Sequence, residues 1–263
     1  MLDQASQTMI DTSSNTRAAV RVSVVIPAKD EADNLRDLIP EIQQALDGER
    51  YEIIVVDDGS DDGTAELVAA MNRADARIRT IRHSRSCGQS AALWSGVQTA
   101  KGELIATLDG DGQNDPQYLP GLLDALDNPE IGLATGQRVG RRASFSKRMG
   151  SRIANAVRGW MLNDNTRDTG CGLKAFRRAA FCDLPYFSSL HRFLPALFKG
   201  DGWQVAHRDV VDRPRMHGRS KYGIFDRLAV GVPDMFGVRW LINRRKRHPL
   251  RLAGQLEDSE RGA

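Results

Sequence analysis

The chain has 263 residues, enough for one sizeable α/β domain but few for two, and its hydrophobic fraction of 41% is ordinary for a soluble globular protein. No apolar run approaches the roughly 18 residues that a membrane-spanning helix needs. The net charge of +3 hides an asymmetry, because residues 1–137 carry 11 Lys and Arg against 23 Asp and Glu, whereas residues 138–263 carry 26 against 11. The basic second half indicates an anionic partner such as phosphates, an anionic membrane or nucleic acid.

The first 20 residues are polar and lack the basic start and apolar core of a signal peptide, so we expect a disordered tail at 1–20. The cysteines are odd in number and lack metal-site spacing, which fits a reducing compartment. We expect Cys87, Cys171 and Cys182 to act as small buried hydrophobic residues.

Short β-branched or apolar runs alternate with segments of helical spacing through the first half of the chain. They predict strands at 22–27, 51–56, 78–82, 104–108 and 131–137, and helices at 35–46, 65–71, 91–97 and 119–126. A glycine-rich turn at 168–177 leads into a short strand, and 203–212 is a last strand. Because alternating strands and helices are joined by right-handed crossovers, the pattern predicts an α/β fold with a mostly parallel central sheet flanked by helices.

Two carboxylates and an amide follow the predicted strand at 104–108. Asp109, Asp111 and Gln113 share a turn in which Gly110 and Gly112 let the backbone bend and approach a ligand. Such oxygen ligands suit Mg²⁺ or Mn²⁺, and the end of a buried strand is where open α/β sheets bind ligands. An acidic solvated turn is the alternative.

The acidic turn at 57–64 is a second candidate site. An EF-hand reading fails, because its twelfth position is Ala69 and not Glu. What remains is an acidic residue at a strand tip, suited to a ribose or a base N–H. The sequence has no Gly-x-Gly-x-x-Gly after the first strand and no Gly-x-x-x-x-Gly-Lys loop, which disfavours dinucleotide cofactors and P-loop chemistry.

Three basic segments follow in the second half. The stretch 141–152 predicts a surface turned toward phosphate or anionic lipid, or a helix with a solvated basic face. The stretch 213–223 predicts a cationic lid over a pyrophosphate, or a solvated loop. We expect 226–248 to be an amphipathic, basic, membrane-proximal segment and 249–263 a polar tail. Asp168 could pair with an arginine or face the site.

Seven motifs in this order resemble family 2 glycosyltransferases, in the branch with dolichyl-phosphate mannose synthases and bacterial polyprenyl-phosphate glycosyltransferases. The similarity covers roughly residues 21–225. The motifs are Pro27–Glu31, Asp57–Ser60, Asp109–Gln113, Thr135–Arg138, Asp168–Gly170, His191–Pro195 and Gly218–Tyr222. This resemblance implies a GT-A fold, a Rossmann-like nucleotide-sugar-binding architecture, over 21–225. It also implies an inverting, metal-dependent transfer of a hexose from a GDP- or UDP-sugar to a polyprenyl phosphate, at the cytoplasmic face of a membrane.

The resemblance also implies roles for individual residues. Asp111 and Gln113 would hold a metal. Arg215 and Lys221 would close over donor and acceptor. The residues implied for catalysis are Asp109, Asp111, Arg215 and Lys221. The residues implied for the nucleotide sugar are Pro27, Lys29, Glu31, Val55, Asp57, Asp109, Gly110, Arg138, Arg215 and Lys221. Lys29 replaces a tyrosine of many relatives, so the base is left open.

The acceptor class follows from a chemical difference. A phosphate monoester, with a second pKa of about 6, is already ionised and needs no general base, whereas a hydroxyl acceptor needs a positioned carboxylate. Near His191 and Arg192, where hydroxyl-directed relatives tend to have an acidic pair, the chain offers cations, so we expect a lipid phosphate. Its candidate contacts are Arg138, Arg148, Ser151 and Arg152. We expect an anionic membrane surface or a small membrane protein as a partner. The alternatives are a hydroxyl acceptor, or a non-catalytic basic module for anionic lipid or nucleic acid.

Overall fold

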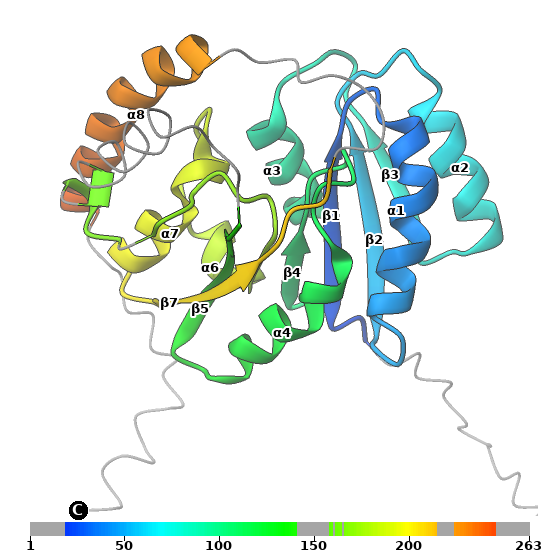
Figure 1. The fold of residues 1–263 in the computed structure, drawn as a ribbon, viewed down its shortest axis with the longest axis horizontal. Helices are drawn as coiled ribbons and strands as arrows, with labels where there is room; N and C mark the ends of the chain where they lie inside the picture. Colours follow the sequence, from blue (N-terminus) through cyan, green and yellow to red (C-terminus); the bar gives the residue numbers. More distant parts are fainter. Residues whose placement is uncertain (1–18, 141–157, 160, 165, 215–223, 246–263) are drawn as a thin grey trace, which may run out of the picture.

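The computed structural model describes residues 19–140, 158, 159, 161–164, 166–214 and 224–245, and within them one sheet of seven strands forms the centre of the molecule (Figure 1). The strands are β1 (Val22–Ala28), β2 (Tyr51–Asp57), β3 (Ile78–Arg82), β4 (Leu104–Thr107), β5 (Ile131–Arg138), β6 (Lys174–Arg177) and β7 (Gln204–Val210). The helices are α1 (Ala32–Ala45), α2 (Thr64–Ala74), α3 (Gln89–Thr99), α4 (Leu119–Asp124), α6 (Arg178–Cys182), α7 (Leu190–Gly200) and α8 (Ile224–Arg244), with 3₁₀ turns at Pro116–Tyr118 and Ala125–Asp127.

The strand order in the sheet is β3-β2-β1-β4-β6-β5-β7, and every neighbouring pair is parallel except those that involve β6. The predicted α/β class with a mostly parallel sheet is therefore confirmed. Because β6 is antiparallel to β4 and β5, its first residue lies where they approach their ends. Lys174 pairs with Thr107 of β4 and with Thr135 of β5. The direction of β6 thus brings a lysine to the edge where β4 ends.

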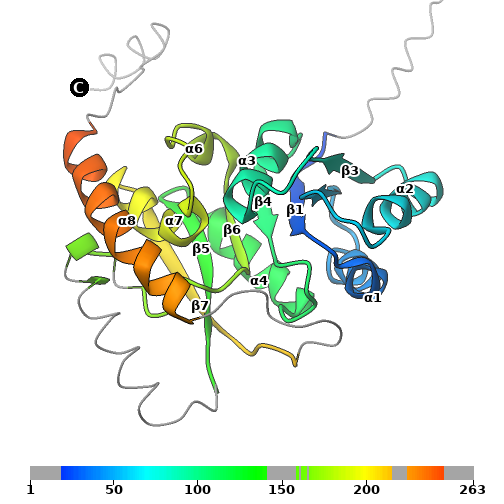
Figure 2. The ribbon, with the colours of Figure 1, turned by 90° about the horizontal axis from the view of Figure 1, so that it is seen from above.

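The sheet is buried on both faces, as the β-branched runs predicted. Val24 and Ile26 of β1 belong to a core cluster with the apolar side of α1, whereas Val25 between them belongs to a second cluster with α3 and α7. Figure 2 shows α1 and α4 on one side of the sheet and α3 and α6 on the other. Successive side chains of a strand point to opposite faces, so one apolar run supplies both layers.

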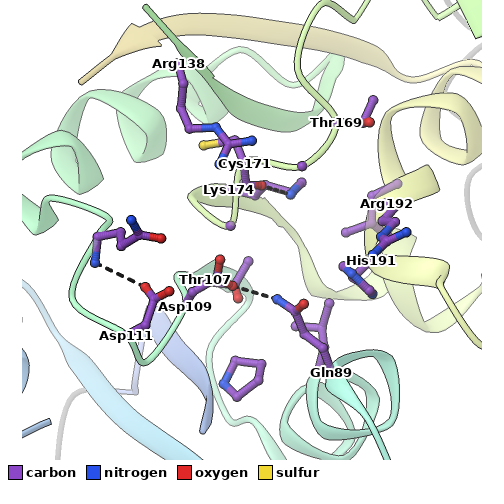
Figure 3. Close-up of a pocket in the computed structure, with 16 residues that line it drawn as sticks. Gln89, Thr107, Asp109, Asp111, Arg138, Thr169, Cys171, Lys174, His191 and Arg192 are labelled. Carbon is purple, nitrogen blue, oxygen red and sulfur yellow. Dashed lines mark hydrogen bonds between the residues drawn. The ribbon is translucent and has the colours of Figure 1, made fainter. Parts of the chain in front are cut away.

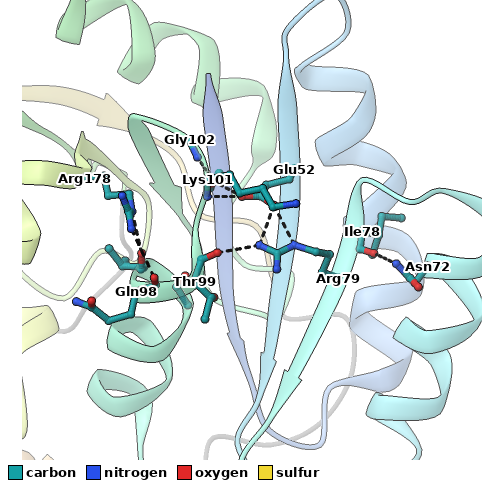
Figure 4. Close-up of polar contacts among 12 residues, drawn as sticks. Glu52, Asn72, Ile78, Arg79, Gln98, Thr99, Lys101, Gly102 and Arg178 are labelled. Carbon is teal, nitrogen blue, oxygen red and sulfur yellow. Dashed lines mark hydrogen bonds and ion pairs between the residues drawn. The ribbon is translucent and has the colours of Figure 1, made fainter. Parts of the chain in front are cut away.

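A buried carboxylate ties the strands together at the edge of the sheet where they begin. Glu52 in β2, only 3% exposed, accepts hydrogen bonds from the Ser23 hydroxyl at 2.7 Å, the Lys101 backbone N–H at 2.7 Å and the Arg79 guanidinium at 2.9 Å. Arg79 also donates to the carbonyl of Thr99 at the end of α3 (Figure 4). These bonds offset the cost of burying the Glu52 charge and join β1, β2, β3 and α3.

A second buried carboxylate, Asp58, holds the loop that leads into α3. Its two oxygens accept hydrogen bonds at 2.8 Å from His83 Nδ1, the Ser86 hydroxyl and the backbone N–H groups of Cys87 and Gly88. Burial raises the pKa of Asp58, but these hydrogen bonds outweigh burial and hold the pKa below its ordinary value of 3.8. Asp58, His83 and Cys87 place ligand-type atoms within 4.8 Å of one another. Since both Asp58 oxygens already have donors, we interpret the cluster as a structural anchor.

The cysteine expectation is only partly correct. Cys171 is buried, but Cys87 is exposed and Cys182 is only partly buried. The prediction was wrong for Cys87 because this residue lies in the exposed loop before α3, where its thiol donates to the backbone carbonyl of Arg85 at 3.3 Å.

The predicted membrane-proximal segment at 226–248 is largely one helix, α8, although Pro233 lies within it. Val238 is buried against the second core cluster, while Phe236 and Trp240 are 62% and 61% exposed. No helix in the described part of the chain is both long and apolar enough to span a bilayer. The two tails at 1–18 and 246–263 lie outside the described residues, and the membrane-proximal role stays a prediction.

We expect Asp58→Asn to lower the free energy of unfolding at pH 7 by about 2 kcal/mol, because an amide cannot accept the four hydrogen bonds that the carboxylate accepts. A lowered folded-state pKa stabilises the fold above the unfolded-state value of 3.8. The difference between wild type and variant should therefore shrink as the pH falls through the lowered pKa of Asp58. Urea unfolding at several pH values measures it. Asp61→Asn, on an exposed residue of the same turn, is the control, and equal losses in both variants would contradict the anchor role.

Candidate functional site

A cavity of about 620 Å³ opens where β1, β4 and β5 end, next to the first turns of α3 and α7 (Figure 3). Parallel strands end at one edge of a sheet, so side chains that follow them gather there. The cavity is lined by Pro27, Gln89, Leu93, Thr107, Asp109, Asp111, Gln113, Arg138, Thr169, Gly170, Cys171, Gly172, Lys174, His191, Arg192 and Leu194.

The predicted metal turn follows β4 and faces this cavity. Gly112 has φ +72°, a backbone conformation that glycine adopts readily, and the Gln113 N–H donates to Asp111 Oδ1 at 3.1 Å. The side-chain amide of Gln89, at the start of α3, donates to Asp109 Oδ1 at 2.6 Å. Burial, followed by the neighbouring charge of Asp111, raises the pKa of Asp109 to about 6. Two carboxylates therefore repel each other at one side of the cavity.

The same turn fits a divalent cation by its donor set. Asp109, Asp111 and Gln113 offer carboxylate and amide oxygens on one side of an open cavity, and these suit Mg²⁺ or Mn²⁺. A bound cation would relieve the repulsion that raises the pKa of Asp109. The expected ligands Asp111 and Gln113 are brought together by the structure, although their role as ligands stays a prediction.

Arg138, at the end of β5, reaches the cavity as part of an ion-pair network. Its guanidinium donates to Asp168, with Nη2 and Oδ1 2.7 Å apart, and its Nη1 lies 3.4 Å from Asp212 Oδ2. Burial lowers the pKa of Arg138, but the two carboxylates raise it above its ordinary value. Of the two alternatives predicted for Asp168, the structure shows the pairing with an arginine. The positive charge of Arg138 is thus largely balanced within the protein.

Lys174 lies at the back of the cavity, where β6 begins between β4 and β5. It is only 3% exposed, and its Nζ donates to the carbonyl of Cys171. Burial lowers the pKa of Lys174, while the charges of Cys171 and Asp109 act in the opposite direction. The lysine therefore lies close enough to Asp109 for their charges to interact, and its hydrogen bond to Cys171 fixes the turn before β6.

The first turn of α7 forms the side of the cavity that faces the metal turn. Figure 3 shows His191 and Arg192 on one side and Asp111 on the other. His191 Nδ1 lies 2.7 Å from the hydroxyl of Ser90, the second residue of α3. Burial, and then the charges of Lys174 and Arg192, lower the pKa of His191 to about 3, so the imidazole is neutral at physiological pH.

Among the residues predicted for the nucleotide, the structure brings only some to this cavity. Pro27, Asp109 and Arg138 line it. Gly110 is buried, and a Cβ there would lie 3.1 Å from the Pro27 carbonyl oxygen. The backbone of Gly110 therefore packs closely against β1.

Four further predicted residues lie at or near the ends of β1 and β2 without lining the cavity. Lys29 and Glu31 are half-buried between β1 and α1. Asp57 is fully buried and accepts from the Ser60 N–H at 2.8 Å, and Val55 is fully buried in the core. Their predicted roles remain predictions, as do those of the candidates that lie outside the described residues, Arg148, Ser151, Arg152, Arg215 and Lys221.

Sequence reasoning did not name Gln89, Lys174, His191 and Arg192 as site residues, although all four line the cavity. Gln89 follows the glycine that opens α3. His191 and Arg192 were expected only as cations that argue against a hydroxyl acceptor, and this was wrong for His191 because its lowered pKa leaves the imidazole neutral. Lys174 carried no signal, because its position depends on the antiparallel direction of β6.

Comparison with known proteins adds to this geometry. Residues 23–184 match the family model for glycosyl transferase family 2. The chain is 33% identical over 246 residues to a dodecaprenyl-phosphate galacturonate synthase of Rhizobium johnstonii, covering 90% of this chain and 72% of the relative. It is 34% identical over 206 residues to an undecaprenyl-phosphate 4-deoxy-4-formamido-L-arabinose transferase of Edwardsiella ictaluri, covering 77% of this chain but only 63% of that protein.

Among solved structures, a glucosyl-3-phosphoglycerate synthase of Mycobacterium tuberculosis, determined with Mn²⁺, UDP-glucose and glycerol 3-phosphate, superimposes with a TM-score of 0.64. The match covers 89% of this chain and 83% of that one at 19% identity, so it supports the fold alone. With the family model matched across β1 to α6 and relatives above 30% identity, the chain belongs to glycosyl transferase family 2 and is a glycosyltransferase with the GT-A fold.

Proposed function

We propose that the chain transfers a sugar from a nucleoside diphosphate sugar to a polyprenyl phosphate, with Mg²⁺ or Mn²⁺ as cofactor. The printed names of both relatives describe proteins that act on polyprenyl phosphates, which supports this acceptor class. The Mn²⁺ and UDP-glucose in the neighbouring structure support the donor and metal classes only by analogy of fold. The membership in a glycosyltransferase family argues against a purely binding module.

The observation that carries the acceptor assignment is the distribution of acids around the cavity. Among the lining residues that the structure describes, Asp109 and Asp111 are the only ones with a carboxylate side chain, and both belong to the predicted metal turn. The opposite side has Arg192 and a neutral His191. A hydroxyl nucleophile would need a base on the side from which it attacks, whereas an ionised phosphate needs none. The cavity therefore suits a phosphate acceptor.

The reaction that follows is a single displacement at the anomeric carbon. An acceptor phosphate oxygen supplies an electron pair to that carbon, while its bond to the donor diphosphate oxygen breaks and the nucleoside diphosphate leaves with the bonding pair. The configuration at the carbon inverts. Since the second pKa of a phosphate monoester is about 6, the acceptor gives up no proton during this step at neutral pH.

The chain's own residues would orient the two reactants. Asp111 and Gln113 would hold the metal, which when bound supplies positive charge for the leaving diphosphate. Gln89 holds the Asp109 carboxylate in place, and the charge of Lys174 acts on the same carboxylate. These contacts position charge before the donor arrives, so little reorganisation is needed during the reaction.

A glycine allows Asp109 its position. A Cβ added to Gly172, in the turn before β6, would lie 2.5 Å from the Asp109 carboxyl carbon. That separation is well below normal van der Waals contact, so any side chain at this position would displace Asp109 or the turn.

The exposed side of α8 supports a membrane-proximal location. Phe236 and Trp240 are one helical turn apart, and the Arg244 guanidinium lies 5.8 Å from the Trp240 ring centroid. Aromatic side chains beside cations suit the interface of an anionic membrane, which would also hold the lipid acceptor. A small membrane protein is the other partner that this surface could take.

We expect Asp111→Asn to reduce metal-dependent release of nucleoside diphosphate with a polyprenyl phosphate acceptor by about 100-fold or more, because a metal ligand and its charge are lost. Turnover at a series of Mn²⁺ concentrations measures the effect. Asp124→Asn, on the exposed side of α4, is the control. Unchanged turnover in Asp111→Asn would refute the metal site, and wild-type activity on a sugar lacking phosphate would favour a hydroxyl acceptor.

Gly172→Ala should reduce turnover by about tenfold or more, because the new Cβ would displace the Asp109 carboxylate from its position. Steady-state kinetics and thermal unfolding measure activity and folding separately. At Gly121, in α4, an added Cβ would have no atom within 4 Å, so Gly121→Ala is the matched control. Full activity in Gly172→Ala would contradict the importance of the Asp109 position.

We expect the double variant Phe236→Ser, Trp240→Ser to bind phosphatidylglycerol vesicles about tenfold more weakly than wild type, because it loses two aromatic anchors. Co-sedimentation measures binding. Val211→Ser, at a residue that is 54% exposed on another surface, controls for a general loss of apolar area. If wild type itself does not bind vesicles, a membrane protein replaces the lipid surface as the expected partner.

A further inference from the structure

The proposed reaction leaves one contact unexplained, the one between the first turns of α3 and α7. Ser90 is buried, and its Oγ lies 2.7 Å from His191 Nδ1 and 3.3 Å from the backbone nitrogen of His191. A backbone N–H can only donate, so Oγ accepts from it, and the hydroxyl proton of Ser90 is available for donation to Nδ1. A neutral imidazole that accepts at Nδ1 carries its proton on Nε2.

The environment of His191 keeps its imidazole neutral. Burial and the nearby cations Lys174 and Arg192 disfavour the imidazolium, which lowers the pKa of His191 to about 3. Such a histidine does not act as a general base near neutral pH, because its basicity is too low. When Nδ1 accepts from Ser90, the Nε2–H of this neutral imidazole is a hydrogen-bond donor on the side of the cavity that also carries Arg192.

We propose that the start of α7 is the subsite for the acceptor phosphate, with His191 Nε2–H and the Arg192 guanidinium as its donors and Ser90 as a positioning residue. The inference rests on the proposed function and deepens it. A fixed N–H and a guanidinium recognise an anion with several acceptor oxygens better than a sugar hydroxyl. The ligand is therefore the phosphate monoester end of a prenyl chain.

The geometry of the reaction places the nucleophile on this side. In an inverting displacement the nucleophile approaches the carbon opposite to the leaving group, and the metal turn with Asp111 lies across the cavity from His191 and Arg192 (Figure 3). Arg138, the one of the four expected acceptor contacts that lies within the described residues, is paired with Asp168 and Asp212. The α7 subsite places its donors on the side from which the nucleophile approaches.

The test compares two substitutions of His191 that differ in the nitrogen they replace. His191→Gln can place an amide N–H near the position of Nε2, whereas His191→Asn places its amide near Nδ1 and leaves the cavity without the donor. Geranyl phosphate serves as a soluble acceptor, and geraniol as the probe without phosphate. Isothermal titration gives the affinity for geranyl phosphate, and a second titration with nucleoside diphosphate and Mn²⁺ reports on the donor side. Arg192→Gln and Ser90→Ala complete the set, and thermal unfolding identifies variants that do not fold.

We expect His191→Asn and Arg192→Gln to weaken geranyl phosphate binding by about 10- to 100-fold, the loss of one charge-assisted hydrogen bond. The affinity for nucleoside diphosphate should not change, and His191→Gln should retain most of the geranyl phosphate affinity. Ser90→Ala should raise the KM for geranyl phosphate with little change in the affinity for nucleoside diphosphate.

Two results would overturn the assignment in different ways. If wild type transfers sugar to geranyl phosphate but His191→Asn and Arg192→Gln bind it normally, or lose nucleoside diphosphate binding instead, the acceptor subsite lies elsewhere while the proposed function stands. If wild type neither binds geranyl phosphate nor transfers sugar to it, the proposed function fails and this inference fails with it.

Discussion

Both sides of the cavity depend on one short segment, the loop after β3 together with the first turn of α3. Asp58 fixes this loop through hydrogen bonds to both of its carboxylate oxygens. The segment then places Gln89 against Asp109 on the metal side and Ser90 against His191 on the α7 side. Hydrogen bonds weaken steeply when distance or angle changes, so a shift of this loop would disturb both sides together.

The balance of charges in the cavity decides which groups are available to a ligand. Asp109 and Asp111 repel each other, which makes their side receptive to a cation. Arg138 is the reverse case, because Asp168 and Asp212 already surround its guanidinium with negative charge. The type of a residue alone is therefore a poor guide to the role of that residue, since a neighbouring opposite charge can hold an arginine in an ion pair within the protein.

The sequence predicted most of the sheet, because β-branched runs between helical segments describe buried parallel strands whatever their neighbours are. It also predicted the pairing options of Asp168 without choosing between them. It did not predict the antiparallel direction of β6 or the burial of Val55 away from the cavity, because strand order and the face on which a side chain lies depend on contacts between distant segments.

By itself the sequence determined the metal turn, since Asp109, Asp111 and Gln113 are neighbours in the chain and share one turn. It also determined the α/β class and, through ordered motifs, the family. Only the tertiary structure decided that α3, β6 and α7 bring Gln89, Lys174 and His191 to the cavity that this turn faces. It alone decided that His191 is neutral as well. The reason is physical, because a pKa depends on burial and on charges contributed by residues far apart in sequence, which the fold alone brings together.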